Sequence, residues 1–221
     1  MSQRIAMLTT LLVWTQAGPI HAQTAGYPVI PRVLPDSEEI LLARSAAPAE
    51  ISKAASVYTV RDGKPVLLRA GANGCSCMVS RDLHGGSLYP ICFDVEATKS
   101  VLPRELMEFG MRNAGRSEDA VKRAVDSAYL AGVLRPPASL ATAYMMSPRQ
   151  MLFSSPEADG RGVGAWHPHI MLFMPNATPQ QFGLAPDSKV DVISVGAPGT
   201  PRAEVVVIVP HWADGTPAPP R

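Results

Sequence analysis

The order in which hydrophobic periodicity changes along the chain constrains its fold more than any other feature. Residues 56–93 contain short segments with the two-residue alternation of strands, residues 102–132 carry apolar stripes at helical spacing, and residues 142–209 return to strand-like segments. Helices do not alternate with strands, as they would in a parallel α/β fold. The order therefore predicts a single α+β domain over residues 36–213, with a largely antiparallel sheet and a helical pair in the middle of the chain.

Turn residues divide the first strand region into two hairpins. Asp62-Gly63 separates predicted strands at residues 57–60 and 65–69, and the second hairpin pairs residues 75–81 with 88–93. We therefore predict that these four strands form an antiparallel meander. The later strands are expected at residues 142–146, 150–153, 166–174, 190–195 and 203–209.

A helix is predicted near the N-terminal end of the domain, over residues 36–47. Asp36 can cap its first turn, Glu39 occupies the capping-box position, and Pro48 ends it. Residues 23–35 before it are spaced by prolines and are expected to form an extended lead-in.

The helical pair in the middle of the chain has recognisable starts and apolar faces. Pro103 suits the first turn of one helix, whose stripe includes Leu106 and Phe109. Ser117 can cap the other helix, which is expected to end at Gly132. We expect this pair to pack on the sheet.

The first 22 residues have the three-part form of a secretory signal peptide. Arg4 precedes an apolar run at residues 5–14, and a more polar segment ends at Ala22. The run is too short to span a bilayer, which takes about 20 apolar residues. We therefore predict cleavage after Ala22 and export to the periplasm or the extracellular space. At the other end of the chain, residues 214–221 are expected to form a disordered tail.

The charge balance argues against two classes of function. The chain has 20 basic and 19 acidic residues, and removal of the signal peptide with its single arginine leaves 19 of each. Nucleic-acid binders and polybasic membrane-surface proteins need a basic excess. We expect neither nucleic-acid binding nor a transmembrane segment after removal of the signal peptide.

Three cysteines in an exported chain predict one disulfide and one thiol left over. In a hairpin centred between His84 and Gly85, Cys77 and Cys92 face each other across the two strands. We therefore predict a Cys77–Cys92 disulfide. The alternatives for Cys75 are a redox or soft-metal site shared with Cys77, burial, or a disulfide between two chains of a homodimer.

The histidine pair in the segment 166–171 is the best candidate for chemistry. On a strand, His167 and His169 would share a face with their Cα atoms about 6.6 Å apart, and two imidazoles at that spacing can bind one ion. Zinc or copper would suit them, and Met171 on the same face would favour copper. No third ligand is placed by spacing, so structural roles for both histidines remain the alternative, and no other cofactor is predicted.

Three stretches of the chain resemble a group of exported bacterial proteins of unknown function. The likeness covers most of the chain after the signal peptide, and it implies a bacterial, exported, single-domain protein without naming an activity, a cofactor or a catalytic residue. The three stretches are residues 38–48, residues 73–94, and Tyr144-Met-Met-Ser147 with the segment 166–171.

The residues together favour a soluble exported protein with a non-catalytic binding or accessory role in the cell envelope. The alternative is a metal-binding protein or metal-dependent enzyme that uses His167 and His169. The catalytic residues, and whether there are any, stay open. A homodimer linked through Cys75 is the one partner that the sequence suggests.

Overall fold

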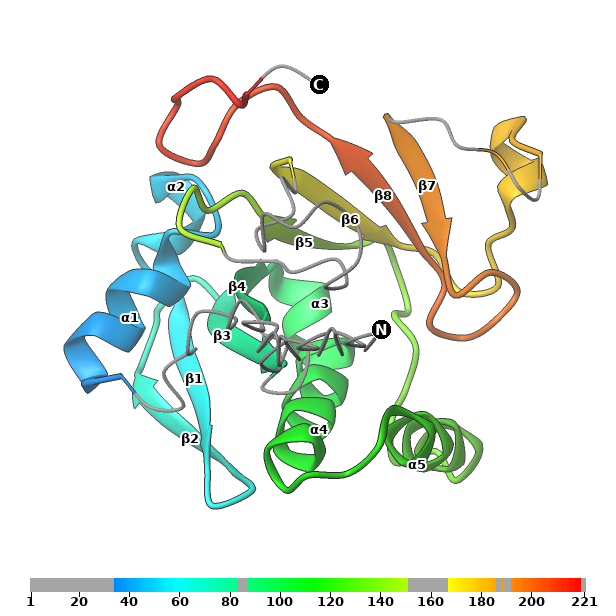
Figure 1. The fold of residues 1–221 in the computed structure, drawn as a ribbon, viewed down its shortest axis with the longest axis horizontal. Coiled ribbons are helices and arrows are strands. Elements are labelled where there is room, and N and C mark those ends of the chain that lie inside the picture. The colour runs from blue at the N-terminus through cyan, green and yellow to red at the C-terminus, as the bar shows by residue number, and fades with distance from the viewer. Residues whose placement is uncertain (1–33, 83–86, 151–166, 186–187, 189–191, 220–221) are drawn as a thin grey trace, which may run out of the picture.

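An eight-stranded sheet organises the residues that the computed structural model describes, which are 34–82, 87–150, 167–185, 188 and 192–219 (Figure 1). The strand order is β2-β1-β3-β4-β5-β6-β8-β7, and every neighbouring pair is antiparallel except β1 with β3. The predicted single α+β domain with a largely antiparallel sheet is therefore confirmed. The strands are β1 (Ser56–Arg61), β2 (Lys64–Arg69), β3 (Ser76–Asp82), β4 (Ser87–Phe93), β5 (Ala141–Met145), β6 (His169–Phe173), β7 (Ile193–Gly196) and β8 (Glu204–Ile208).

The first hairpin forms as predicted, but the meander does not. Asp62 and Gly63 both adopt positive φ, 49° and 71°, which is the conformation of a tight two-residue hairpin turn between β1 and β2. After β2 the chain crosses past the start of β1. There the amide of Ala72 donates a hydrogen bond to the carbonyl of Ala54, and the amide of Ser56 donates one to the carbonyl of Cys75. The crossing places β3 beside β1 and parallel to it, so β2 becomes an edge strand.

The second hairpin confirms the predicted disulfide. Strands β3 and β4 pair antiparallel from Ser76 opposite Phe93 to Asp82 opposite Ser87, and this register places Cys77 opposite Cys92. The two residues form a disulfide with their Cα atoms 4.0 Å apart. Both cysteines are fully buried.

The end of the predicted helix 36–47 is wrong, and two helices, at residues 49–52 and 95–100, were not predicted. Helix α1 (Asp36–Arg44) begins after Pro35 without a side-chain cap and is shorter than predicted. Glu39 does not form the predicted capping box, because its carboxylate binds the buried guanidinium of Arg81 at 2.7 Å. Pro48 then precedes a further short helix rather than ending the first one. The helices are α1 (Asp36–Arg44), α2 (Ala49–Ser52), α3 (Val95–Ser100), α4 (Leu102–Asn113), α5 (Glu118–Leu130) and the 3-10 turn η1 (Pro179–Phe182).

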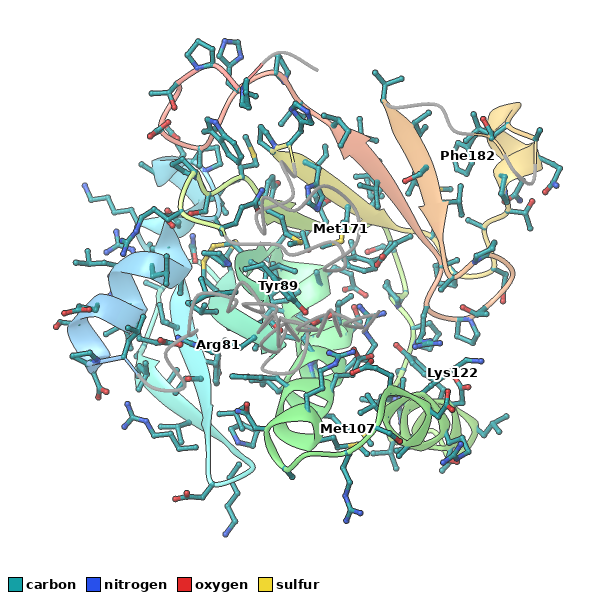
Figure 2. All side chains as sticks on the ribbon, viewed as in Figure 1. Arg81, Tyr89, Met107, Lys122, Met171 and Phe182 are labelled. Atoms are coloured by element: carbon teal, nitrogen blue, oxygen red, sulfur yellow. A yellow bond between two sulfur atoms is a disulfide. The ribbon has the colours of Figure 1, made fainter. Side chains whose placement is uncertain are left out.

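The helical pair in the middle of the chain is confirmed as α4 and α5. The proline at position 103 lies in the first turn of α4, and the hydroxyl of Ser117 accepts a hydrogen bond from the amide of Ala120 to cap α5. Helix α5 packs on α4 through a small cluster that includes Val121, Val125 and Met107. Figure 2 labels Met107 between the two helices.

Helices cover both faces of the sheet and give two cores. On one face, α1 packs over the disulfide and over Val57 and Val79. On the other face, α3 and α4 pack over residues such as Ile91 and Phe93, and this core continues along the sheet to Phe173. In Figure 1 the first four strands accordingly lie between α1 and α4.

The C-terminal strands build the far half of the sheet. The predicted strand 166–174 is shorter in the structure, beginning at His169 because Pro168 before it lacks the amide needed for the strand ladder. The predicted strand at 150–153 and the start of the one at 190–195 lie largely outside the described residues, as do the signal peptide and most of the lead-in. Residues 212–216 form a turn that is closed by a bridge between His211 and Pro217.

Reduction of the disulfide should destabilise the protein by about 3 kcal/mol, because the bond closes a loop between residues separated by 15 positions in the sequence. Urea unfolding of the wild type and of a Cys77→Ala/Cys92→Ala variant would measure the difference in free energy. A Cys75→Ser variant is the matched control and should unfold like the wild type. Equal stability of the double variant and the wild type would contradict the prediction.

Candidate functional site

A cavity of about 380 Å³ lies between α4 and the C-terminal half of the sheet. Its floor is apolar and is formed by side chains from four neighbouring strands, β4, β5, β6 and β8. Figure 2 shows Tyr89 and Met171, which both line the cavity, near the centre of the view above α4. The four apolar floor residues are Ile91, Met145, Met171 and Val206.

The wall of the cavity is a charged stripe on α4. Arg104, Glu108 and Arg112 lie four residues apart and therefore on one side of the helix, with Glu105 beside them. Their side chains are only 8–16% exposed. The stripe therefore faces the protein interior, although charged side chains at this spacing usually face water.

Ion pairs within the stripe compensate for most of this burial. A terminal nitrogen of Arg104 donates to Glu105 at 2.7 Å, and one of Arg112 lies 3.2 Å from a carboxylate oxygen of Glu108. Arg112 also donates to the exposed Glu118 at 2.9 Å. The neighbouring carboxylates more than offset burial and raise the pKa of Arg104, so it keeps its charge.

Two arginine nitrogens beside the cavity lack a hydrogen-bond acceptor among the residues that the structure describes. The Nε of Arg104 is buried and lies 3.8 Å from the nearest carboxylate oxygen of Glu108, too far for a hydrogen bond. The Nε of Arg202 is also buried, and a terminal nitrogen of this residue lies 3.7 Å from Asp126. The ring of Phe173 lies beneath the Arg104 guanidinium, 5.6 Å from ring centre to carbon.

Glu204 is the acidic group that the sheet contributes to the cavity. It begins β8 and pairs with Gly196 on β7. A Cβ atom at Gly196 would lie 2.9 Å from the Oε1 of Glu204, so the glycine leaves the space in which the carboxyl group lies. Burial raises the pKa of Glu204 to about 7, and the neighbouring carboxylates add to the shift against the opposing effect of Arg104 and Arg202.

Glu108 shares this perturbation. Burial raises its pKa, repulsion from Glu105 adds to the effect, and Arg104 and Arg112 oppose it. Because the pKa of Glu204 is raised to about 7, its carboxyl group is partly protonated near pH 7 and can donate a proton or a hydrogen bond as well as accept one. The cavity therefore offers both donors and acceptors over an apolar floor.

The structure places only one of the two predicted metal ligands in the cavity. His169 lines it and is 1% exposed, while His167 is half-buried and is not part of its lining. The Nδ1 of His169 donates to the backbone carbonyl of His167 at 2.9 Å, and burial lowers the pKa of its ring. Within the described ranges, no three His, Cys, Asp or Glu residues are arranged to hold a metal ion.

Cys75 lies away from the cavity, beside the disulfide core. Its side chain is half-buried and packs against the cluster under α1. Burial raises the pKa of the thiol, and Asp94 adds to the shift, so the thiolate is disfavoured at neutral pH. A dimer linked through Cys75 stays a prediction.

Sequence reasoning missed the residues that make the cavity distinctive. The charges at positions 104, 108 and 112 carry a helical spacing that was available in the sequence, but the same spacing is typical of a solvated helix face. Glu204 directly precedes the apolar run 205–209, where an acidic residue resembles the end of a strand. Of the residues that line this cavity, the sequence singled out only His169 and Met171 as candidate ligands.

No helix in the described part of the chain is both long and apolar enough to cross a membrane.

The stability of the protein should depend on pH through Glu204. Because its folded pKa is raised above the unfolded value, the folded state holds the proton more tightly, and the stabilisation present in acid is lost as pH rises from about 4.5 through 7. Relative to a Glu204→Gln variant, the wild type should lose on the order of 2 kcal/mol between pH 5 and pH 8. The titration of His169 is common to both proteins and cancels. Parallel pH profiles of the two unfolding free energies would contradict this assignment.

The metal hypothesis has its own direct measurement. If His167 and His169 bind an ion, the protein purified without an affinity tag should contain near-stoichiometric zinc or copper by elemental analysis, and a His167→Ala/His169→Ala variant should lose it. A His211→Ala variant serves as the control. A folded wild-type protein that contains no metal and takes up neither added ion would rule the hypothesis out.

Comparisons of the chain with protein-family models, with curated proteins and with solved structures found no match in any of the three.

Proposed function

We propose that this chain is an exported binding protein for a small molecule, and that the cavity between α4 and the sheet is its binding site. The observation that carries the proposal is the cavity itself, whose volume of about 380 Å³ lies within the usual range for small-ligand sites. Its composition also suits that role, because an apolar floor faces a few polar groups held in fixed positions.

Rigid elements hold the lining in place. The floor residues lie on paired strands, and β8, which contributes Val206, is paired with a neighbour on each side. The charged wall lies on a helix of 12 residues that is anchored to the same sheet by Leu106 and Phe109. A site built on strands and a helix keeps its geometry in the absence of ligand, which reduces the entropy lost on binding.

Export is part of the proposal and rests on the sequence of residues 1–22. The Cys77–Cys92 disulfide supports it, because such bonds persist in oxidising compartments outside the cytoplasm. Recovery of the mature chain from the periplasmic fraction, beginning at Gln23, is the expected outcome of export followed by cleavage after Ala22.

The pKa of Glu204 favours a second candidate, an enzyme that uses this carboxyl group as a general acid or base. Such a group works best when its pKa lies near the operating pH, and burial raises that of Glu204 to about 7. The two candidates separate on the fate of the ligand. A binding protein returns it unchanged after long incubation, whereas an enzyme converts it and loses that activity in a Glu204→Gln variant.

The binding proposal predicts that filling the cavity abolishes ligand binding. Val206 lines the floor, and its neighbour Val207 faces the opposite side of the sheet with similar exposure, so Val206→Phe and Val207→Phe form a matched pair. A thermal-shift screen of small metabolites should find compounds that raise the melting temperature of the wild type and of Val207→Phe but not of Val206→Phe. Hits that stabilise all three proteins equally, or no hits, would contradict the proposal.

A further inference from the structure

We propose that the ligand is an organic acid with one negative charge, whose carboxylate lies between Arg104 and Arg202 and whose apolar body rests on the floor of the cavity. This inference rests on the binding function proposed above and names the chemical class of the ligand.

The first step of the argument is that two positively charged groups present donors without acceptors at the same cavity. The Nε atoms of Arg104 and Arg202 are buried and make no hydrogen bond to any described residue. The side chain of Arg104 is 8% exposed, so water has little access to it. A buried donor without a partner is costly, and more so on a charged group. A carboxylate in the cavity would supply acceptors to both arginines.

The second step is the charge balance around the cavity. Three arginines face three carboxyl groups, but Glu105 and Glu108 already pair with Arg104 and Arg112. The third carboxyl group, Glu204, is largely neutral below pH 7 because burial raises its pKa to about 7. Among the residues that line the cavity, three positive charges then face two negative ones. Glu118 and Asp126, which lie outside the lining, also approach Arg112 and Arg202. Neither of them supplies an acceptor to the Nε atoms of Arg104 and Arg202, so these two arginines can still take one anionic group.

The other titratable groups at the cavity do not change this balance near neutral pH. Burial raises the pKa of Tyr89, so its phenol stays protonated, and burial lowers the pKa of His169, so its ring stays neutral. The groups whose charge acts on Glu204 are Arg104, Glu105, Glu108 and Arg202, and the neighbouring β7 contributes Gly196.

The third step is the position of the apolar floor. Met171 and Val206 are direct neighbours in the register of β6 and β8, and Phe173 and Glu204 are the next pair on the same face of the sheet. Arg104 stacks on Phe173, so its guanidinium lies beside the Phe173–Glu204 pair, next to the Met171–Val206 pair of the apolar floor. A ligand with its charge at one end and hydrocarbon at the other matches this arrangement.

The experiment compares carboxylates with their primary amides, which have the same shape and no charge. The pairs are benzoate, 3-phenylpropanoate, hexanoate and octanoate with the corresponding amides, and binding to the mature wild-type protein is measured by calorimetry at pH 6.5. At least one carboxylate should bind tenfold or more tightly than its amide. Arg202→Gln should remove this preference, and Arg104→Lys, which keeps the charge but loses the Nε donor, should weaken it.

Arg123→Gln removes an exposed arginine on α5 and is the matched control, which should bind like the wild type. The pH profile gives a further readout. Binding of the preferred carboxylate should weaken about tenfold between pH 6.5 and pH 8.5 as Glu204 ionises, and a Glu204→Gln variant should lose this dependence.

The possible failures separate the two proposals. The organic-acid assignment is wrong, and the binding function stands, in either of two cases. In the first, every carboxylate fails to bind, but uncharged compounds from the metabolite screen bind to the wild type and not to Val206→Phe. In the second, amides and carboxylates bind equally. If no compound from either the panel or the screen binds, both are wrong. An affinity for carboxylates that Arg123→Gln reduces as much as Arg202→Gln would also overturn the assignment.

Discussion

The pairing of charges along α4 is the interaction on which the rest of the structure depends. Removing an arginine or a glutamate from water costs several kcal/mol unless an opposite charge accompanies it, and Arg104, Glu108 and Arg112 meet this condition within one stripe. A second stripe on the same helix, with Leu106 and Phe109, packs against the first half of the sheet. The apolar side of α4 therefore packs on the sheet, whereas its charged side faces the strands that carry the floor residues. The cavity is the space between these charged side chains and the floor.

The two halves of the domain differ in what holds them together. Around β3 and β4, apolar packing, the Cys77–Cys92 disulfide and the buried pair of Glu39 and Arg81 act on the face under α1. Around β6 and β8, the helix-covered face carries charged groups and an open volume. Binding sites are commonly found where a rigid framework borders a less well-packed region, and this sheet brings the two together without a separate domain.

Local geometry explains which features could be predicted from the sequence. The disulfide followed from counting residues on either side of one turn, and the β1–β2 hairpin from a two-residue turn signal. The parallel pairing of β1 with β3 depends on which side of a hairpin the chain crosses, and no local pattern encodes that choice. In the candidate site, His169 could be nominated, but Arg104 and Glu204 come together only through the tertiary fold, from positions 100 residues apart in the chain.

The glycine opposite Glu204 has a consequence for how this protein can vary. Gly196 lies on the edge strand β7, and because it has no side chain, the carboxyl group of Glu204 can occupy the space beside it. A side chain at this position would meet the Oε1 and Cγ atoms of Glu204 at 2.9 and 3.1 Å, so the carboxyl group would have to move and its contacts with the charged groups around it would change. The pKa of Glu204 therefore depends on a residue at the edge of the sheet. One substitution at this edge can change that pKa while every side chain of the cavity floor stays the same.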